Sequence, residues 1–381
     1  MAPKNQAAWI LAKNTRPFQV KDAPYTSPGR GQLVVKNTAV AINPFDWVLQ
    51  YIGSILAGHL KYPFVFGTDV AGRVVEVGPD VSRFRVGDRV CGSATALAKT
   101  VNNAAEGGFQ LYTVMREHML APVPDHVTDE QACVIGLGLG TAAYGLFHTD
   151  YLGLDRPKVP APTEVVGRSG KPCAVIITGG ASSVGSNAIQ LAASAGYRVI
   201  STASPKNFHY VEGLGAAHVF DYNSTNLVDR LLGAVNGYEL VGAYAIGQGA
   251  VEACTAVMQR HDSSLTRKRI ALAGGTIDGD KLTTVSGKAS FFFGMIGGIF
   301  ASAARRLATG VEVKFIIVDD LVDPDSVVAY VYKDFLPQAL ERRQFVPAPP
   351  PQIVGGGLDK IQDALDLQRK GVSGRKIVVT L

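Results

Sequence analysis

The sequence predicts an α/β protein built on a doubly wound parallel sheet, preceded by a domain that is mostly β. Two observations support this prediction. Residues 174–191 read AVIITGGASSVGSNAIQL, which is an apolar run, a glycine-rich turn and an apolar pattern with helical spacing. Two more apolar segments, 197–202 and 217–222, follow at the spacing of strands that alternate with helices. This alternation is typical of a domain that binds a dinucleotide.

The first strand of this domain is predicted at 174–177, where a β-branched run without alternation indicates burial on both faces of a sheet. Gly179 then permits a sharp turn, and serine hydroxyls and N–H groups follow where a helix begins. The pattern GGxxxxG is not the strict dinucleotide fingerprint, so the neighbouring strands decide the interpretation. The positions predicted to contact the pyrophosphate are Gly180, Ala181, Ser182, Ser183 and Val184.

The end of the second predicted strand indicates which dinucleotide binds. Residues 202–207 read TASPKN and contain no carboxylate. An NAD site usually has Asp or Glu here for the ribose hydroxyl, whereas an NADP site has hydroxyls and a cation for the 2′-phosphate. Ser204 and Lys206 suit that phosphate, although a solvated turn would leave Lys206 without a role. The sequence therefore favours NADPH as the cofactor.

Composition limits the class of protein. A chain of 381 residues, 47% hydrophobic and 18% charged, fits a globular enzyme of two domains. A net charge of +5 without a block of Lys or Arg argues against a nucleic-acid partner. The N-terminus does not resemble a secretory signal, and the apolar stretch 291–304 is too short to span a membrane. The four cysteines lie far apart, which predicts neither disulfides nor a CxxC zinc site and favours the cytoplasm.

The domain boundaries follow from changes in composition along the chain. The N-terminal part has short predicted strands, such as 69–77, with frequent glycine and proline. Residues 154–171 are rich in proline and polar residues and are interpreted as a surface excursion. The predicted substrate and catalytic domain is 1–150 completed by 341–381, and the predicted nucleotide-binding domain is 151–340.

In this order, the motifs resemble the medium-chain dehydrogenase/reductase superfamily along nearly the whole chain. The matching segments are AINPFDW at 41–47, GTDVAGRVVEVGPDVSRFRVGDRV at 67–90, the turn at 179–185 and the terminal RKIVVTL. The resemblance implies a GroES-like N-terminal domain and a Rossmann NADP-binding domain. It also implies a member without zinc, because the zinc enzymes have Cys in place of Asn43 and His-Glu in place of Thr68 and Asp69.

Within the superfamily the chain is most similar to fungal trans-acting enoyl reductases that serve polyketide synthases. The similarity rests on INPFD, on SPKNF at 204–208 followed by FDY at 220–222, and on residues 356–379. It implies reduction of an activated C=C bond by NADPH, with a hydrophobic natural-product substrate and a polyketide synthase as partner in trans. The further cofactor-binding residues that it implies are Asn43, Asp46, Thr141, Ser204, Lys206, Asn207, Tyr222, Leu272, Ala273, Val372 and Ser373.

The chain departs from these reductases at Val48, where they carry a lysine that is a candidate proton donor. Reduction of an enone produces an enolate that needs a proton, and valine cannot supply one. Three explanations stay open: water or the cofactor ribose delivers the proton, Tyr51, His59 or Tyr62 substitutes, or the fold serves another reaction. Tyr51 is the candidate catalytic residue, with ordinary packing as its alternative. Asp46 has helix capping as its alternative.

Two glycine-containing segments are predicted to contribute to the substrate pocket. The run 136–142 is expected to leave room for a bulky substrate, or else to be a flexible start of a helix. The stretch 290–300 is expected to form an apolar wall, or else a buried helical connection. The predicted pocket residues are Val48, Tyr51, Gly138, Leu139, Phe292 and Phe293.

Other functions remain compatible with the sequence. A quinone reductase or a carbonyl reductase would use the same fold and cofactor and differ in product. A non-redox protein, acting as a synthase partner or guiding a cyclisation, is kept open by Val48. Residues 313–318 predict a late strand of the sheet, and such an edge strand commonly pairs with its copy in a second subunit of this superfamily. A monomer or a homodimer is therefore expected.

Overall fold

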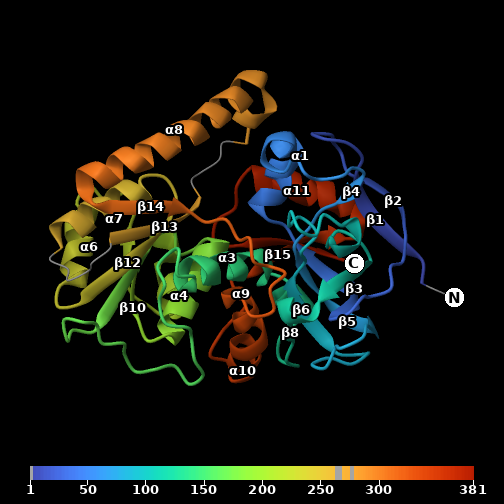
Figure 1. Ribbon diagram of the computed structural model, residues 1–381, viewed down its shortest axis with the longest axis horizontal. Helices are drawn as coiled ribbons and strands as arrows, with labels where there is room; N and C mark the ends of the chain where they lie inside the picture. The colour runs from blue at the N-terminus through green and yellow to red at the C-terminus, as the bar shows by residue number, and fades with distance from the viewer. Residues whose placement is uncertain (1–2, 262–267, 275–278) are drawn as a thin grey trace. The chain divides into compact units, whose positions relative to one another are not determined.

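The structure is a computed structural model that describes residues 3–261, 268–274 and 279–381 (Figure 1). The chain forms two compact units. Unit 1 comprises Met1–Gly140 and Asp319–Leu381, and unit 2 comprises Thr141–Val318. The parallel α/β sheet predicted from the sequence is in unit 2, and the mostly β domain is in unit 1.

Unit 2 is built on a six-stranded sheet in the order β11-β10-β9-β12-β13-β14, in which every neighbouring pair is parallel. Numbered along this unit, that order is 3-2-1-4-5-6, which is the order of Rossmann dinucleotide-binding domains. The doubly wound sheet predicted from the sequence is therefore confirmed. The strands are β9 (Cys173–Ile177), β10 (Arg198–Ala203), β11 (Ala216–Asp221), β12 (Glu239–Ile246), β13 (Lys268–Gly274) and β14 (Val311–Phe315).

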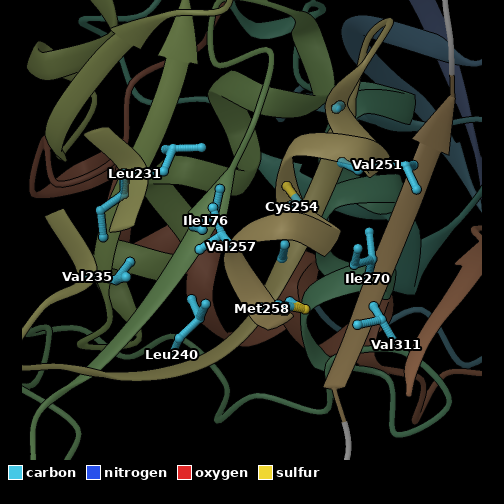
Figure 2. Packing of buried hydrophobic residues seen from close by; sticks show 14 of the residues in the cluster. Ile176, Leu231, Val235, Leu240, Val251, Cys254, Val257, Met258, Ile270 and Val311 are labelled. Atoms are coloured by element: carbon cyan, nitrogen blue, oxygen red, sulfur yellow. The ribbon is translucent and has the colours of Figure 1, made fainter. Parts of the chain in front are cut away.

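Helices follow the strands of unit 2, and two of them cover a face of its sheet. In α7, Val251, Cys254 and Met258 recur at helical spacing and point into one apolar cluster with strand residues such as Ile176 and Ile270 (Figure 2). Helix α6 adds the buried side chains of Leu231 and Val235 to the same cluster. The helices of this unit are α4 (Ser183–Ser194), α5 (Phe208–Gly213), α6 (Leu227–Val235), α7 (Ala250–Arg260) and α8 (Val285–Thr309).

Unit 1 holds a seven-stranded sheet in the order β15-β16-β3-β5-β6-β8, with β7 also paired to β3. A smaller sheet has the order β2-β1-β4. The C-terminal strand β16 runs antiparallel to β3, with Val378 opposite Ala41, so the end of the chain completes the sheet of this unit. The strands are β1 (Asn5–Ile10), β2 (Gln19–Ala23), β3 (Gln32–Ala41), β4 (Phe64–Val65), β5 (Asp69–Val77), β6 (Arg89–Ser93), β7 (Tyr112–Arg116), β8 (Leu120–Pro122), β15 (Pro351–Gly356) and β16 (Lys376–Thr380).

The boundaries of the compact units differ from the predicted domain boundaries. Unit 2 begins at Thr141, inside α3, and ends at Val318, whereas the sequence predicted 151–340. The later helices belong to unit 1 because they pack there: the Tyr332 hydroxyl donates to the Gly136 carbonyl at 2.8 Å, and Tyr332 is fully buried. The helices of unit 1 are α1 (Pro44–Leu56), α2 (Asp129–Ala132), α9 (Val327–Tyr330), α10 (Leu336–Glu341) and α11 (Ile361–Arg369), whereas α3 (Gly136–Phe147) begins in unit 1 and continues in unit 2 from Thr141.

Helix α8 corrects one expectation for the stretch 290–300. It is a single helix of 25 residues, and the Phe292 and Phe293 side chains are 40% and 69% exposed. The interpretation as a buried connection is therefore wrong for these two residues. In the part of the chain that the structure describes, no helix is long and apolar enough to cross a membrane.

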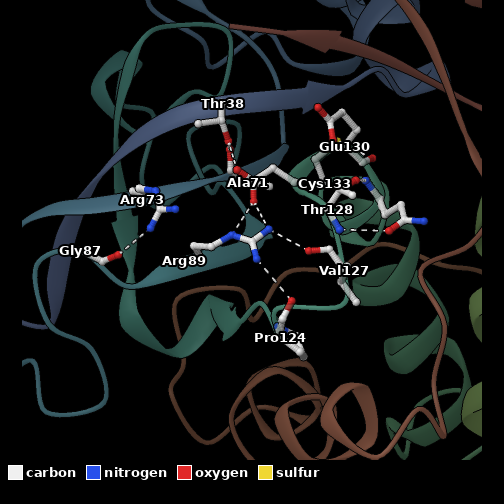
Figure 3. A network of polar contacts seen from close by, with 12 residues as sticks. Thr38, Ala71, Arg73, Gly87, Arg89, Pro124, Val127, Thr128, Glu130 and Cys133 are labelled. Atoms are coloured by element: carbon white, nitrogen blue, oxygen red, sulfur yellow. Dashed lines mark hydrogen bonds and ion pairs between the residues drawn. The ribbon is translucent and has the colours of Figure 1, made fainter.

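Arg89, from the block at 67–90, holds together three segments of unit 1 (Figure 3). Its guanidinium group donates to the Asp129 carboxylate at 2.6 Å and to the carbonyl oxygens of Pro124 and Val127 at 3.3 and 2.8 Å. The Thr38 hydroxyl donates to the same carboxylate at 2.7 Å. The motif therefore has a structural role: a partly buried cation ties β6 to the loop before α2.

We expect Arg89→Met to lower the free energy of unfolding by about 2 kcal/mol, because it leaves partly buried acceptors without a donor. Arg73→Met is the matched control, since the exposed Arg73 guanidinium donates only to the Gly87 carbonyl among the contacts drawn (Figure 3). Urea denaturation of both variants measures the difference. Equal losses in the two variants would contradict the role given to Arg89.

Candidate functional site

In unit 2 the phosphate-binding candidate is the turn between β9 and α4. Gly179 has φ +62°, a conformation that favours glycine, and the Gly180 N–H donates to the Thr202 carbonyl of β10 at 2.8 Å. The Ser182 hydroxyl accepts from the Gly185 N–H at 3.0 Å and so caps α4. The turn is thus fixed between the carboxyl end of β10 and the start of a helix.

Hydrogen-bond donors are left over at this turn. Among the described residues, the N–H groups of Ser183 and Val184 have no acceptor, as expected for the first turn of a helix. The Ser183 hydroxyl is buried and also lacks a partner within the described chain. Free N–H groups at the positive end of a helix dipole fit a phosphate. These residues fit the pyrophosphate of a dinucleotide.

The residues predicted for the 2′-phosphate lie together at the carboxyl ends of β10 and β11. The Asn207 amide donates to the Ser204 hydroxyl at 3.0 Å, so the two side chains are adjacent. Lys206 is exposed, and no ion pair to it is found in the described part of the chain. Tyr222 follows β11, whose Asp221 lies opposite Ala203 of β10, and is 52% exposed. Hydroxyl, amide and ammonium groups therefore gather at one edge of the sheet.

The remaining predicted residues of unit 2 lie on neighbouring elements. Leu272 and Ala273 stand at the carboxyl end of β13, and Leu272 is opposite Ala245 of β12. The Thr141 carbonyl accepts from the Tyr244 hydroxyl of β12 at 2.9 Å. Parallel strands present their carboxyl ends at one edge, so Leu272 and Ala273 lie at the same edge as the phosphate turn.

In unit 1 a ring of four buried polar side chains forms at the start of α1. The Lys376 ammonium donates to the Asn43 carbonyl oxygen at 2.5 Å and forms an ion pair with Asp69 Oδ2 at 2.8 Å. The Asn43 amide donates to the Thr68 hydroxyl at 3.0 Å, and that hydroxyl donates to Asp69 Oδ1 at 3.0 Å. Each of the four residues is 5% exposed or less. We call Asn43, Thr68, Asp69 and Lys376 the polar ring.

The polar ring also holds the beginning of α3. Asp69 Oδ1 accepts from the Leu137 N–H at 2.7 Å, in the first turn of that helix. A carboxylate at a helix N-terminus is stabilised by the dipole of the helix. The ring therefore connects four segments of unit 1: β5, β16 and the starts of α1 and α3.

The comparisons with known proteins agree with this geometry. A family model described as the alcohol dehydrogenase GroES-like domain matches residues 29–125. The dehydrogenase pigH of Monascus ruber is 46% identical over 381 residues, which is 100% of both chains. The chain belongs to the medium-chain dehydrogenase/reductase family. It is an oxidoreductase of that family, and its family membership and fold agree with what the sequence motifs imply.

Other relatives within the family carry more specific names. The trans-enoyl reductase himH of Aspergillus japonicus is 35% identical and covers 99% of this chain and 97% of its own. A mycobacterial protein solved in complex with NADPH has the same fold, with a TM-score of 0.65, 21% identity and 99% of both chains covered.

The catalytic zinc of some medium-chain dehydrogenases does not fit the polar ring. Zinc binds thiolate, imidazole or carboxylate, and a catalytic site needs three such ligands. The ring offers one amide, one hydroxyl and one carboxylate, and that carboxylate is paired with an ammonium ion. In addition, no group of three or more His, Cys, Asp or Glu residues suited to a metal occurs among the residues described.

Asp46 is a second buried carboxyl group beside the ring. Its Oδ2 accepts from the Asn43 N–H at 2.8 Å, which is the capping role foreseen from the sequence, and its Oδ1 is buried without a partner in the described chain. Burial raises the pKa of Asp46 to about 7; the nearby Asp69 raises it further, and the Asn43 N–H and Lys376 oppose the change. Asp46 therefore changes charge near neutral pH.

This raised pKa makes the stability of the protein depend on pH. Between the ordinary value of 3.8 and about 7, the folded state holds a proton on Asp46 that the unfolded state has released. The free energy of unfolding therefore falls as pH rises through this window, by up to about 1.4 kcal/mol per pH unit. Asp46→Asn removes the titration, and we expect its stability relative to the wild type to increase from pH 4 to about 7. Urea unfolding across that range measures the free energy of unfolding of both proteins. If the two free energies change with pH in parallel, Asp46 is not the group that titrates.

Tyr51 and Val48 lie on α1 in a packed environment. The Tyr51 ring is 7% exposed and lies between the guanidinium groups of Arg16 and Arg369, with their central carbons 5.3 and 6.0 Å from its centroid. Its hydroxyl is buried and has no hydrogen-bond partner in the described part of the chain. These contacts support the packing alternative for Tyr51. Val48 is 2% exposed and offers only an aliphatic side chain.

The two other candidate donors near α1 are also engaged or buried. The ring Nε2 of His59 lies 3.1 Å from the Leu97 carbonyl. The Tyr62 hydroxyl is buried, and burial raises its pKa, which weakens it as an acid near neutral pH. These environments do not favour His59 or Tyr62 as a replacement for the missing lysine.

The other residues predicted in unit 1 lie on two separate elements. Gly138 and Leu139 are buried within α3, and Leu139 is fully enclosed. Val372 and Ser373 belong to the loop that precedes β16, in which Ser373 is exposed. Lys376, which follows this loop, is a site residue that the sequence motifs do not indicate. A lysine at the head of an apolar strand was its only signal, and that signal does not indicate burial.

Proposed function

We propose that this protein reduces an activated C=C bond, in an enoyl or enone group, with NADPH as the hydride donor. The observation that carries the proposal is the donor set of the polar ring, where an amide, a hydroxyl and a lysine-paired carboxylate stand at the zinc-ligand positions of the family. An alcohol is oxidised in this family with a Lewis acid that such donors do not hold. A conjugated carbonyl accepts hydride at its β-carbon without one.

When bound, NADPH supplies the hydride that forms the new C–H bond at the β-carbon of the substrate. The residues of unit 2 would hold the cofactor: the N–H groups of Ser183 and Val184 the pyrophosphate, and Ser204, Lys206 and Asn207 the 2′-phosphate. Leu272, Ala273 and Thr141 would lie toward the nicotinamide end. Orientation of the two reactants can by itself supply a large part of the rate.

The proton that completes the reaction adds to the α-carbon of the enolate. The environments of Tyr51, His59 and Tyr62 do not support any of them as its source. We propose that water or a cofactor ribose hydroxyl delivers this proton. Val48 is 2% exposed and carries only an aliphatic side chain, so it supplies no proton to this step.

A polyketide synthase is the proposed source of the substrate, because relatives such as himH are named trans-enoyl reductases. The exposed Phe292 and Phe293 of α8 offer apolar surface that would contact a substrate of this kind. Reduction of a quinone or of a carbonyl group is the competing reaction, and a non-redox role remains a further alternative because of Val48.

The test is incubation with NADPH that carries deuterium at its transferable hydrogen, together with an enone panel and an extract of candidate substrates. We expect a saturated carbonyl product with one deuterium at the β-carbon, detected by mass spectrometry and NMR. An alcohol or a hydroquinone would support the competing reductases. Binding of NADPH without oxidation on the whole panel would support the non-redox alternative.

A further inference from the structure

The polar ring of unit 1 is a closed chain of donors and acceptors. Lys376 donates to Asn43, Asn43 to Thr68, and Thr68 to Asp69, while Lys376 also contacts Asp69 directly. The chain of donation runs in one direction and ends on the carboxylate. Each oxygen that could bind a metal already accepts a hydrogen bond or an ion pair.

The charges in the ring balance in the same way. Asp69 is 0% exposed and Lys376 is 3% exposed, so neither charge is stabilised by bulk water. A buried carboxylate needs a cation or several donors, and here the ammonium ion and the Leu137 N–H provide both. A divalent ion at Asp69 would stand beside this ammonium ion in a poorly polarisable environment, where repulsion between cations is strong.

We infer that the Lys376 ammonium is the resident cation of the polar ring, and that it keeps divalent metals out even when metal-binding side chains are provided. This chain then differs from a zinc enzyme in two ways. It lacks zinc ligands at positions 43 and 68, and it has an internal cation, the Lys376 ammonium, that pairs with the Asp69 carboxylate.

The test compares two variants of the full-length protein in cobalt titrations. Asn43→Cys with Thr68→His restores a thiolate and an imidazole beside Asp69, giving three ligands of the catalytic zinc type. The second variant adds Lys376→Ala, which removes the ammonium ion and frees space. We expect Co²⁺ to bind the triple variant with the visible absorption of a cobalt thiolate, and to bind the double variant about tenfold or more weakly.

Lys376→Ala alone is the matched control and should give no cobalt absorption, because it lacks thiolate and imidazole. Equal cobalt affinity of the double and triple variants would overturn the inference, and so would a folded triple variant that binds no cobalt. The readout uses neither NADPH nor substrate. Failure here therefore leaves the proposed reduction untouched, and failure of the reduction leaves this test unchanged.

A second measurement keeps the inference open to refutation if the triple variant does not fold. Lys376→Met and Asp69→Asn are compared singly and together by urea denaturation. Each single change leaves one buried charge without its partner, so we expect the double variant to recover at least part of the loss in midpoint. Additive losses would show that Lys376 is not the cation that balances Asp69.

Discussion

Lys206→Glu is expected to raise the dissociation constant for NADPH about tenfold or more, because it replaces a charge-assisted phosphate contact by repulsion. Lys206 lies at the carboxyl end of β10 beside Ser204 and Asn207, and it is exposed and without an ion pair in the described chain. A phosphate would therefore be its first anionic partner. Quenching of protein fluorescence or the change in NADPH fluorescence gives the constant.

Two comparisons separate a phosphate contact from a general effect of charge. Affinity for NADH should change little in Lys206→Glu, since NADH has no 2′-phosphate. Lys171→Glu makes the same change at an exposed lysine before β9, at the amino edge of the sheet, and should leave NADPH affinity unchanged. If Lys206→Glu binds NADPH as tightly as the wild type, the 2′-phosphate is held elsewhere.

The strand, turn and helix that carry the proposed nucleotide site could be predicted from the sequence because their signals are local. The strand, turn and first helix of unit 2 lie within 22 residues, Cys173–Ser194, and each has its own pattern of apolar residues, glycines and serines. The residues proposed for the 2′-phosphate likewise fall mostly in one segment, 204–207. Local patterns of this kind persist in the folded chain, since the carboxyl ends of parallel strands meet at one edge.

The polar ring of unit 1 could not be predicted in the same way, because its contacts join distant positions. Lys376 and Asn43 are 333 residues apart, and nothing near either residue indicates that they touch. Tyr51 is similar, because its ring contacts Arg369 of α11, which comes from the other end of the chain. Charged residues at long separation have no periodic pattern that could reveal such pairs.

The predicted pocket wall shows a third kind of limit. The stretch 290–300 is rich in phenylalanine and glycine, and the sequence favoured a pocket wall over a buried helical connection. In α8 the side chains of Phe292 and Phe293 are exposed within a long helix. Hydrophobicity predicts that an apolar helix face will be buried, but it does not predict whether the rest of the protein or a ligand buries that face.

Gly185→Ala is expected to weaken NADPH binding about tenfold or more and to destabilise the protein by about 1–3 kcal/mol. A Cβ atom at this position would lie 2.3 Å from the Gly179 carbonyl oxygen and 3.0 Å from the Gly180 Cα. Both are backbone atoms of the phosphate turn, so α4 and the turn must move apart. The N–H groups of Ser183 and Val184 would then no longer point at the position of the pyrophosphate.

Gly233→Ala in α6 is the matched control for this change. A Cβ atom there meets nothing within 4 Å, and alanine is the better helix former, so its stability should rise by up to about 1 kcal/mol with NADPH affinity unchanged. Affinities are compared at a temperature at which urea denaturation shows all the proteins to be folded. If Gly185→Ala then binds NADPH with the wild-type constant, close contact between helix and turn is not what positions the N–H groups. If the NADPH affinity of Gly185→Ala falls while its unfolding midpoint stays high, the altered geometry of the turn causes the loss of affinity. The fold is then intact, but α4 and the turn no longer approach closely enough to hold the pyrophosphate.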